Sequence, residues 1–179
     1  MIEILAYVAV ASVVGGVALL AYASTRPDTF SVARTASIDA PAERIFPLIN
    51  DLRAMNTWNP FVLNDPRLKG DYSGSPSGAG AAYAFAGKRS GAGRIEITGA
   101  SPPGKVAMNL VMLKPMKAEN TIEFTLAPKG ASTNVTWAMT GHVPLAGKVL
   151  HLFMDMDKMC GKTFEEGLAK LKVMAEERG

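Results

Sequence analysis

The sequence predicts an α+β domain in which a curved antiparallel sheet of six to seven strands packs against one long C-terminal helix. In residues 148–177 apolar side chains recur every three or four positions, which places them on one face of an α-helix. In residues 30–140 short segments alternate apolar and polar residues and are separated by Gly and Pro. A sheet with one apolar face needs a cover, and the long helix can supply it.

The C-terminal stretch carries the strongest helical pattern. Its apolar positions are Val149, Phe153, Met156, Cys160, Phe164, Leu168, Leu171 and Met174. No proline interrupts them, so we expect one continuous helix. Burial of such side chains at about 1.5–3 kcal/mol each would contribute on the order of 10–20 kcal/mol before conformational entropy is subtracted. Cys160, the single cysteine, excludes an internal disulfide and is expected to be a small core residue.

Composition separates the first residues from the rest. The chain has 179 residues, 48% of them hydrophobic, which is enough for one domain with a full core. Residues 1–23 contain a single charge, Glu3, and every Lys and Arg lies beyond them. The remainder is mildly basic, but no basic run is interleaved with aromatic residues. The composition therefore excludes a nucleic-acid-binding surface of the usual kind.

The apolar segment at residues 2–23 is long enough to cross a hydrocarbon core of about 30 Å. We expect a transmembrane anchor at 1–23, a linker at 24–29 and a domain at 30–179. A cleaved signal peptide is the alternative, because Ala21-Tyr22-Ala23 resembles a cleavage site. The absence of Lys or Arg before the segment and its length favour the anchor.

The orientation of a single-pass anchor depends on few charges. Arg26 and Arg34 follow the segment, whereas only Glu3 precedes it. The positive-inside rule therefore favours a cytoplasmic domain, while a periplasmic domain or a cleaved signal stays open.

Small residues within the same segment indicate a possible contact face. Ala11 with Gly15, and Ser12 with Gly16, have the spacing that lets two helices approach closely. The expected partners are therefore a lipid bilayer through residues 2–23, and a second copy or another membrane protein through these small residues.

The domain begins with a strand and two short helices. Residues 30–38 alternate, with Arg34 as the one charge on the apolar side, either in an ion pair at the sheet rim or as a polar contact in a pocket. Asp39-Ala40-Pro41 starts a helix, with Pro41 in its first turn, and a second short helix follows at 50–57. Trp58 and Phe61 then flank a helix-breaking proline, either as core residues or as the lining of a pocket mouth.

The following segments predict an antiparallel meander. Apolar residues alternate with polar ones in 81–87, 94–100, 106–112, 119–126 and 134–140. Turn-forming residues separate these segments, as at Pro102-Pro103-Gly104 and Pro128-Lys129-Gly130. Successive hairpins of this kind give a sheet with one buried face.

Segments at both ends of the domain resemble a known superfamily. They are Val32-Ala33-Arg34, Ile38-Asp39-Ala40-Pro41-Ala42-Glu43-Arg44-Ile45-Phe46, Trp58-Asn59-Pro60, Thr133-Asn134-Val135-Thr136-Trp137 and Gly161-Lys162-Thr163-Phe164-Glu165-Glu166-Gly167-Leu168. With the order of elements, they resemble the START-related, birch-pollen-allergen-like (SRPBCC) superfamily, in its polyketide cyclase/dehydrase and lipid-transport branch. The resemblance covers residues 30–175. It implies a helix-grip fold with a cavity between sheet and final helix that accepts a hydrophobic or amphipathic molecule.

No catalytic set and no metal or cofactor site is recognisable in the sequence. His142 and His151 are the two histidines, and no His, Cys, Asp or Glu cluster has metal-ligand spacing. Gly-x-Ser-x-Gly does not occur, and Cys160 has no histidine close in sequence that would activate a nucleophile. We therefore lean against an enzyme.

The candidate ligand-binding residues are those expected to face the space between sheet and helix. They are Arg34, Trp58, Phe61, Tyr83, Phe85, Met108, Met112, Asn120, Phe124, Trp137, Met139, Phe153, Met156 and Phe164. Methionine side chains repack around irregular ligands, and Arg34 and Asn120 would orient a mostly apolar molecule. The alternative is that these residues fill a dry core.

Three functions are compatible with these patterns. The first is membrane-tethered binding of a hydrophobic or lipid-like molecule, since a tether keeps the site close to the source of such ligands. The second is a non-catalytic subunit of a membrane protein complex with a solid core. The third is an enzyme of the cyclase/dehydrase type, which the resemblance permits but no acid–base pair supports.

Overall fold

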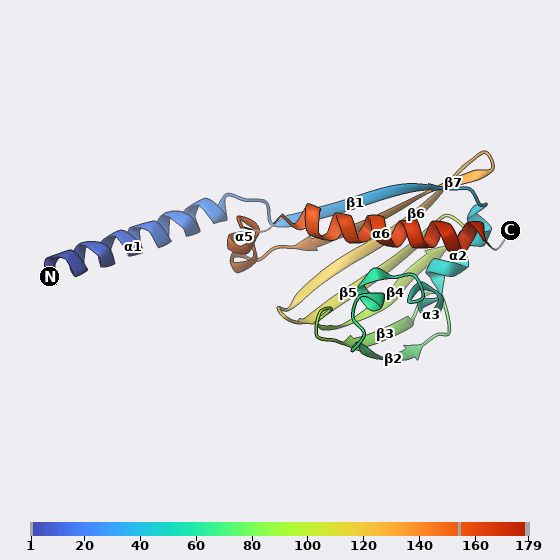
Figure 1. The fold of residues 1–179 in the computed structure, drawn as a ribbon, viewed down its shortest axis with the longest axis horizontal. Helices are drawn as coiled ribbons and strands as arrows, with labels where there is room; N and C mark the ends of the chain where they lie inside the picture. The colour runs from blue at the N-terminus through green and yellow to red at the C-terminus, as the bar shows by residue number, and fades with distance from the viewer. Residues whose placement is uncertain (1, 154, 178–179) are drawn as a thin grey trace.

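The computed structural model of the chain shows an N-terminal helix followed by a curved sheet that wraps around the C-terminal helix (Figure 1). It describes residues 2–153 and 155–177, with the backbone alone for residues 2, 3, 5, 6, 8–10, 151 and 156. The ends of the predicted anchor and domain, at residues 1 and 178–179, lie outside the described residues.

The elements follow the predicted order. The helices are α1 (Ile2–Ser24), α2 (Ala42–Asn50), α3 (Leu52–Met55), α4 (Pro60–Leu63), α5 (Leu145–His151) and α6 (Met156–Glu176). The strands are β1 (Thr29–Ile38), β2 (Lys69–Gly74), β3 (Ala81–Ala86), β4 (Ala92–Ser101), β5 (Lys105–Lys114), β6 (Ala118–Lys129) and β7 (Ser132–His142).

The strands form one antiparallel sheet of seven strands in the order β1-β7-β6-β5-β4-β3-β2. β2 to β7 are a meander, and β1 pairs with β7, so the first strand joins the last. The register of β4 against β5 shifts between Ile97 and Gly99, a bulge that increases the local twist. The predicted α+β fold with an antiparallel sheet and a C-terminal helix is confirmed.

The core lies between the inner face of the sheet and α6, with α2 and α3 closing one end. α6 lies along β1 across the concave side of the sheet (Figure 1). Residues that alternate along each strand supply the sheet side of this core, as with Ile122, Phe124 and Leu126 on β6. Leu168, Leu171 and Ala175 supply the helix side, which matches the predicted apolar face.

The predicted continuous helix at residues 148–177 is wrong at its start. α5 ends at His151 and α6 begins at Met156. Asp155 caps the new helix, because its carboxylate accepts a hydrogen bond of 3.1 Å from the Lys158 N–H. Phe153 falls in the break and is 75% exposed, so it does not lie on the inner face.

The short helices also differ from expectation. Pro60 does not end a helix; it begins α4, because Asn59 accepts a hydrogen bond from Phe61 N–H at 3.1 Å and proline fits a first turn. α2 starts at Ala42 with Pro41 as its N-cap residue, one position later than predicted. α3 is shorter than the helix predicted at 50–57.

α1 forms a helix over the predicted apolar segment and projects away from the sheet (Figure 1). Its C-terminal end is held near α5, where the buried Lys148 pairs with Asp28 at 2.5 Å and donates to the Ser24 carbonyl at 3.4 Å. Among the residues described, no helix is both long enough and apolar enough to cross a membrane. The transmembrane helix expected at residues 2–23 is therefore not supported by the structure.

Candidate ligand-binding site

One half of the inner face is packed solid by aromatic rings. Trp137 stacks on Phe164 at 4.2 Å with an angle of 6° between the rings, and Trp58 meets Trp137 edge-on at 5.8 Å. Phe124 contacts both tryptophans, with ring centroids 6.0 and 5.0 Å away. Trp58 is further fixed by a hydrogen bond of 2.8 Å from its indole N–H to the Leu48 carbonyl. These side chains form the core rather than the lining of an open space.

A glycine on α6 makes this close packing possible. A Cβ at Gly167 would lie 2.7 Å from the Trp137 ring and 3.0 Å from Pro60. The helix therefore approaches the sheet more closely here than a side chain would allow.

The other half of the inner face is only partly covered, and we name it the mouth. It is defined by Phe30, Phe85, Leu110, Met112, Asn120 and Gly141. All except Asn120 are of intermediate exposure, in contrast to fully buried inner residues such as Ile38, Ile97 and Val135 at the opposite ends of their strands. Burial therefore decreases along the inner face toward the mouth.

The mouth is held together by close contacts between neighbouring strands. A Cβ at Gly93 would lie 3.1 Å from the Phe85 ring and 3.2 Å from the Met112 sulfur, so both side chains pass over this glycine. Leu110 is opposite Asn120 in the register of β5 and β6. The surface that results is mainly apolar, which is the usual composition of a small-molecule site.

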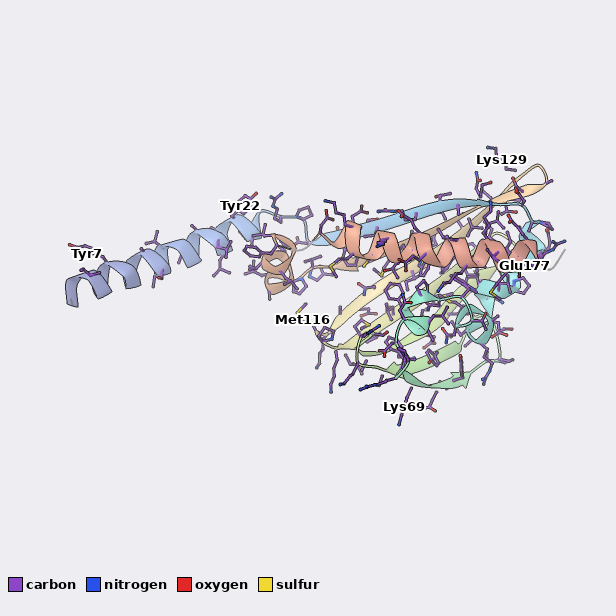
Figure 2. The ribbon with its side chains drawn as sticks, viewed as in Figure 1. Tyr7, Tyr22, Lys69, Met116, Lys129 and Glu177 are labelled. Atoms are coloured by element: carbon purple, nitrogen blue, oxygen red, sulfur yellow. The ribbon has the colours of Figure 1, made fainter. Side chains whose placement is uncertain are left out.

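Exposed apolar side chains surround the mouth. Phe61 on α4 is 39% exposed and packs edge-on against Trp137 and Phe164 at 6.3 Å. Met116, at the β5–β6 hairpin, is 52% exposed. Met116 projects from the end of the domain nearer to α1, whereas Lys129 and Glu177 lie at the far end (Figure 2).

Asn120 is the polar residue of the mouth. It is 7% exposed, and its Oδ1 atom is buried without a hydrogen-bond partner. The carboxamide lies over Gly141, where a Cβ would overlap Oδ1 and come within 2.6 Å of the Phe30 ring. The missing side chain at position 141 thus makes room for a polar group on an otherwise apolar surface.

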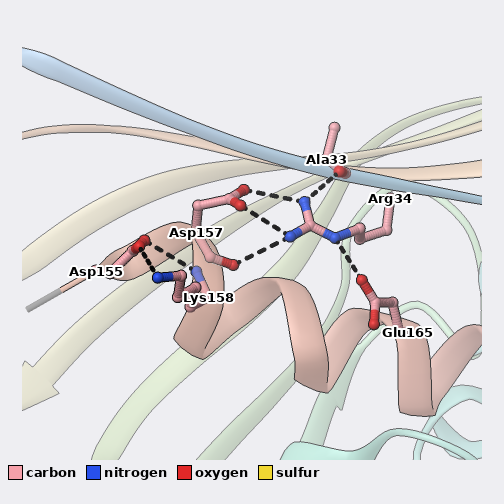
Figure 3. Close-up of polar contacts among 6 residues, drawn as sticks. All are labelled: Ala33, Arg34, Asp155, Asp157, Lys158 and Glu165. Atoms are coloured by element: carbon pink, nitrogen blue, oxygen red, sulfur yellow. Dashed lines mark hydrogen bonds and ion pairs between the residues drawn. The ribbon is translucent and has the colours of Figure 1, made fainter.

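Arg34, the other predicted orienting group, is held by α6 (Figure 3). Its two terminal nitrogens donate to the two Asp157 oxygens at 2.9 Å each, and its Nε donates to Glu165 at 2.7 Å. Gly161 allows this approach, because a Cβ there would overlap the guanidinium. Of the two interpretations of Arg34, the structure shows the ion pair at the sheet rim.

The ion pair between Arg34 and Asp157 shifts the pKa of each group so that both stay charged. The hydrogen bonds to Asp157 and then to Glu165 raise the pKa of Arg34 above its ordinary value. The hydrogen bond from Arg34 lowers the pKa of Asp157. Burial, with a smaller contribution from the Asp157 charge, raises the pKa of the Cys160 thiol, so this cysteine is not activated as a nucleophile.

The predicted site residues therefore fall into different places. Buried in the core or at its edge are Trp58, Tyr83, Met108, Phe124, Trp137, Met139 and Phe164. Phe85, Met112 and Asn120 lie at the mouth, with Phe61 at its rim, and the side chain of Met156 lies outside the described residues. The prediction missed Phe30, Leu110 and Gly141, although the first two follow the same alternation as their buried neighbours.

A hollow lies away from the mouth and is lined partly by polar residues. It has a volume of about 270 Å³ and lies between the start of α3 and the far end of the β2–β3 hairpin, with Asp51, Ser73 and Ser75 in its lining. Arg53 covers the Tyr72 ring there at 4.1 Å. Among the described residues, no three His, Cys, Asp or Glu side chains are grouped so as to hold a metal ion.

A meander that closes around a C-terminal helix, after a first strand and short helices, defines the helix-grip class of α+β proteins. The chain belongs to the family described as polyketide cyclase / dehydrase and lipid transport, whose model matches residues 29–176. The predicted superfamily is thereby confirmed, and its fold is consistent with binding of a hydrophobic ligand. A comparison with curated proteins found no match.

Solved structures show the same fold at low sequence identity. The protein CV1439 of Chromobacterium violaceum is 18% identical, with a TM-score of 0.58 over 84% of this chain and 99% of that one. Ara h 8.0201 is 9% identical, with a TM-score of 0.59 over 83% and 99% of the two chains. The Aha1 dimer of Colwellia psychrerythraea is 18% identical, with a TM-score of 0.55 over 80% and 93%.

Proposed function

We propose that the domain binds a hydrophobic or lipid-like small molecule at the mouth, between the sheet and α6. The observation that carries this proposal is the loss of burial along the inner face, from a packed aromatic core to partly exposed apolar side chains at the mouth. Side chains such as Phe85 and Leu110 offer apolar surface that a ligand would remove from water, at about 25 cal/mol per Å² buried. Membership of the family is in keeping with such a ligand.

Extraction of the purified full-length protein tests this proposal. The protein is purified in mild detergent, extracted into organic solvent and analysed by mass spectrometry for co-purifying lipids. We expect a lipid at a fixed ratio to protein, and a lower ratio after Leu110→Asp, which places a charge at the mouth. A matched control is Val111→Asp on the same strand, since Val111 is 38% exposed and points to the opposite face. Lipid-free protein that takes up neither a fluorescent fatty acid nor a fluorescent fatty alcohol would contradict the proposal.

We also propose that α1 holds the protein at a lipid bilayer. Val13, Val14 and Val17 are 62–66% exposed, and an apolar surface of this extent marks an interaction site. Tyr7 and Tyr22 lie toward the two ends of the helix, as interfacial aromatic residues do (Figure 2). The mouth would then lie at the end of the domain nearer to the bilayer.

Membrane fractionation of cells that express the full chain tests this attachment. We expect the protein to stay in the membrane fraction after washes with salt and with alkaline carbonate. Protease protection tests the expectation that the domain faces the cytoplasm. Release of the intact protein by salt alone would contradict apolar attachment.

The aromatic core supports a second candidate, a non-catalytic subunit of a membrane complex. Trp58, Trp137 and Phe164 fill the space between sheet and helix as a solid scaffold would. A Cβ at Gly15 or Gly16 would meet nothing within 4 Å, so this side of α1 is open to a partner helix. A stoichiometric partner in mild detergent that is lost in Gly15→Leu/Gly16→Leu, together with lipid-free protein, would favour this candidate.

A further inference from the structure

We propose that Asn120 is the polar anchor of the ligand and that the ligand is a neutral molecule with a hydroxyl group on a mainly apolar body. This inference rests on the proposed function and narrows its ligand class. Fatty alcohols, sterols and monoacylglycerols belong to this class. Ethers and ionised fatty acids do not.

The starting point is the unpaired oxygen of Asn120. Asn120 is 7% exposed, and its Oδ1 atom has no hydrogen-bond partner. A buried polar atom in this state destabilises the folded protein, so such atoms are uncommon and call for a partner that the protein itself does not supply. Because Oδ1 only accepts hydrogen bonds, that partner is a donor.

The surroundings of Asn120 supply no donor of their own to Oδ1. Gly141 lies beneath the carboxamide and has no side chain that could cover it. The nearby Phe30 and Leu110 are apolar and partly exposed, so neither competes for the oxygen and both can contact the ligand body. The carboxamide is thus the polar feature of an apolar surface, the arrangement that orients a ligand in a small-molecule site.

The two buried or half-buried cations at this end of the domain are already paired. Arg34, the cation on the inner side of β1, is already paired with Asp157 and Glu165. Lys148, the buried cation of α5, is paired with Asp28. An ionised fatty acid would bring its negative charge against Oδ1, which carries a partial negative charge and needs a donor, whereas a hydroxyl group supplies the donor and no charge.

Two isomers that differ in this one property provide the test. Hexadecanol carries a hydroxyl donor, and its isomer methoxypentadecane carries an ether oxygen that can only accept. Binding of each to the full-length protein is followed through tryptophan fluorescence and thermal stability, with the ligand delivered from cyclodextrin. We expect hexadecanol to bind about tenfold more tightly, the effect of one hydrogen bond to a buried acceptor.

The variant Asn120→Leu removes the acceptor at nearly constant volume. We expect it to bind the two isomers equally, through weaker binding of hexadecanol. Asn109→Leu is the matched control, since Asn109 lies on the same sheet and its Nδ2 donates to Glu119 at 2.9 Å outside the mouth. This control should keep the preference for the alcohol.

The outcomes separate the two proposals. Equal binding of both isomers by the unaltered protein, or a preference that persists in Asn120→Leu, would overturn the role of Asn120 and leave the proposed function intact. Binding of neither isomer and of no other lipid would overturn both. The isomer pair on the unaltered chain decides the question even if the variant does not fold.

Discussion

At the residue level, Asp65 shows how one buried carboxylate joins segments that are distant in sequence. It is 4% exposed, and it accepts backbone hydrogen bonds from Ser90, Arg89 and Arg67 at 3.0, 2.8 and 3.3 Å. These bonds fix the β3–β4 turn against the connection between α4 and β2. The hydrogen bonds, that from Ser90 first, lower the pKa of Asp65.

We predict that Asp65→Asn lowers the melting temperature by several degrees at neutral pH, because an amide accepts these bonds less well than a carboxylate. A lowered carboxyl pKa stabilises the fold above the ordinary value of 3.8, and this contribution is lost as the pH falls through the folded-state pKa. The difference between variant and unaltered protein should therefore shrink toward acid pH. Thermal melts from pH 7 to 3 measure this difference in melting temperature. Asp71→Asn, at an exposed position, is the control. A difference independent of pH would contradict this explanation.

Asn120 gives a second prediction at this scale. A buried polar group that binds a ligand lowers the stability of the protein when the ligand is absent. Asn120→Leu should raise the free energy of unfolding of the ligand-free protein by about 1–3 kcal/mol, the cost of an unsatisfied buried polar atom. Urea denaturation of protein freed of lipid measures the change. A loss of stability would indicate that the carboxamide serves the fold rather than a ligand.

At the element level, α6 is held to the sheet in two different ways. Its C-terminal half packs by Leu168, Leu171 and Ala175 in the core. Its N-terminal half is tied to β1 through Arg34, whose partners Asp157 and Glu165 lie on different turns of the helix (Figure 3). The first turns of α6, which border the mouth, are therefore held by charge, and the helix from Phe164 onward packs in the apolar core.

We predict that Arg34→Met loosens the first turns of α6 and leaves the rest of the helix protected. Amide hydrogen exchange should become several-fold faster near residues 157–165 and stay unchanged at 168–176. Because the pKa of Asp157 is lowered by Arg34, acid pH should produce the same local change in the unaltered protein as the carboxylate is protonated. Arg53→Met, which removes an exposed arginine from the Tyr72 ring, is the control. Uniform acceleration along the whole helix would contradict the prediction.

Periodicity predicted the strands and α6 well, because alternation and three-to-four spacing report burial directly. It did not predict the break before α6, since Met156 and Phe153 fit the apolar pattern and the Asp155 cap acts through one local hydrogen bond. The partners of Arg34 lie 123 and 131 residues away, a separation that no local pattern encodes. The mouth depends likewise on Gly141, whose only sequence signal is its alternation with Met139.

At the scale of the whole molecule, the mouth, the exposed hairpin residue Met116 and α1 lie toward the same end of the protein (Figures 1 and 2). The packed aromatic core occupies the other part of the domain. This arrangement, with the mouth at one end and the packed core at the other, fits a domain that takes up ligand from the side where α1 is attached. The core beyond the mouth would remain rigid while the ligand enters.

We predict that a ligand bound at the mouth stabilises the whole domain, because the sheet and α6 share one core. A ligand at about one hundred times its dissociation constant adds about 2.7 kcal/mol to the free energy of unfolding. For a chain of this size that corresponds to a rise of about 5–10 °C in melting temperature. Differential scanning calorimetry with increasing hexadecanol should show a rise that grows with the logarithm of ligand concentration. A rise of equal size in Leu110→Asp would show that the alcohol stabilises the protein from another site, since the charge at the mouth should abolish binding there.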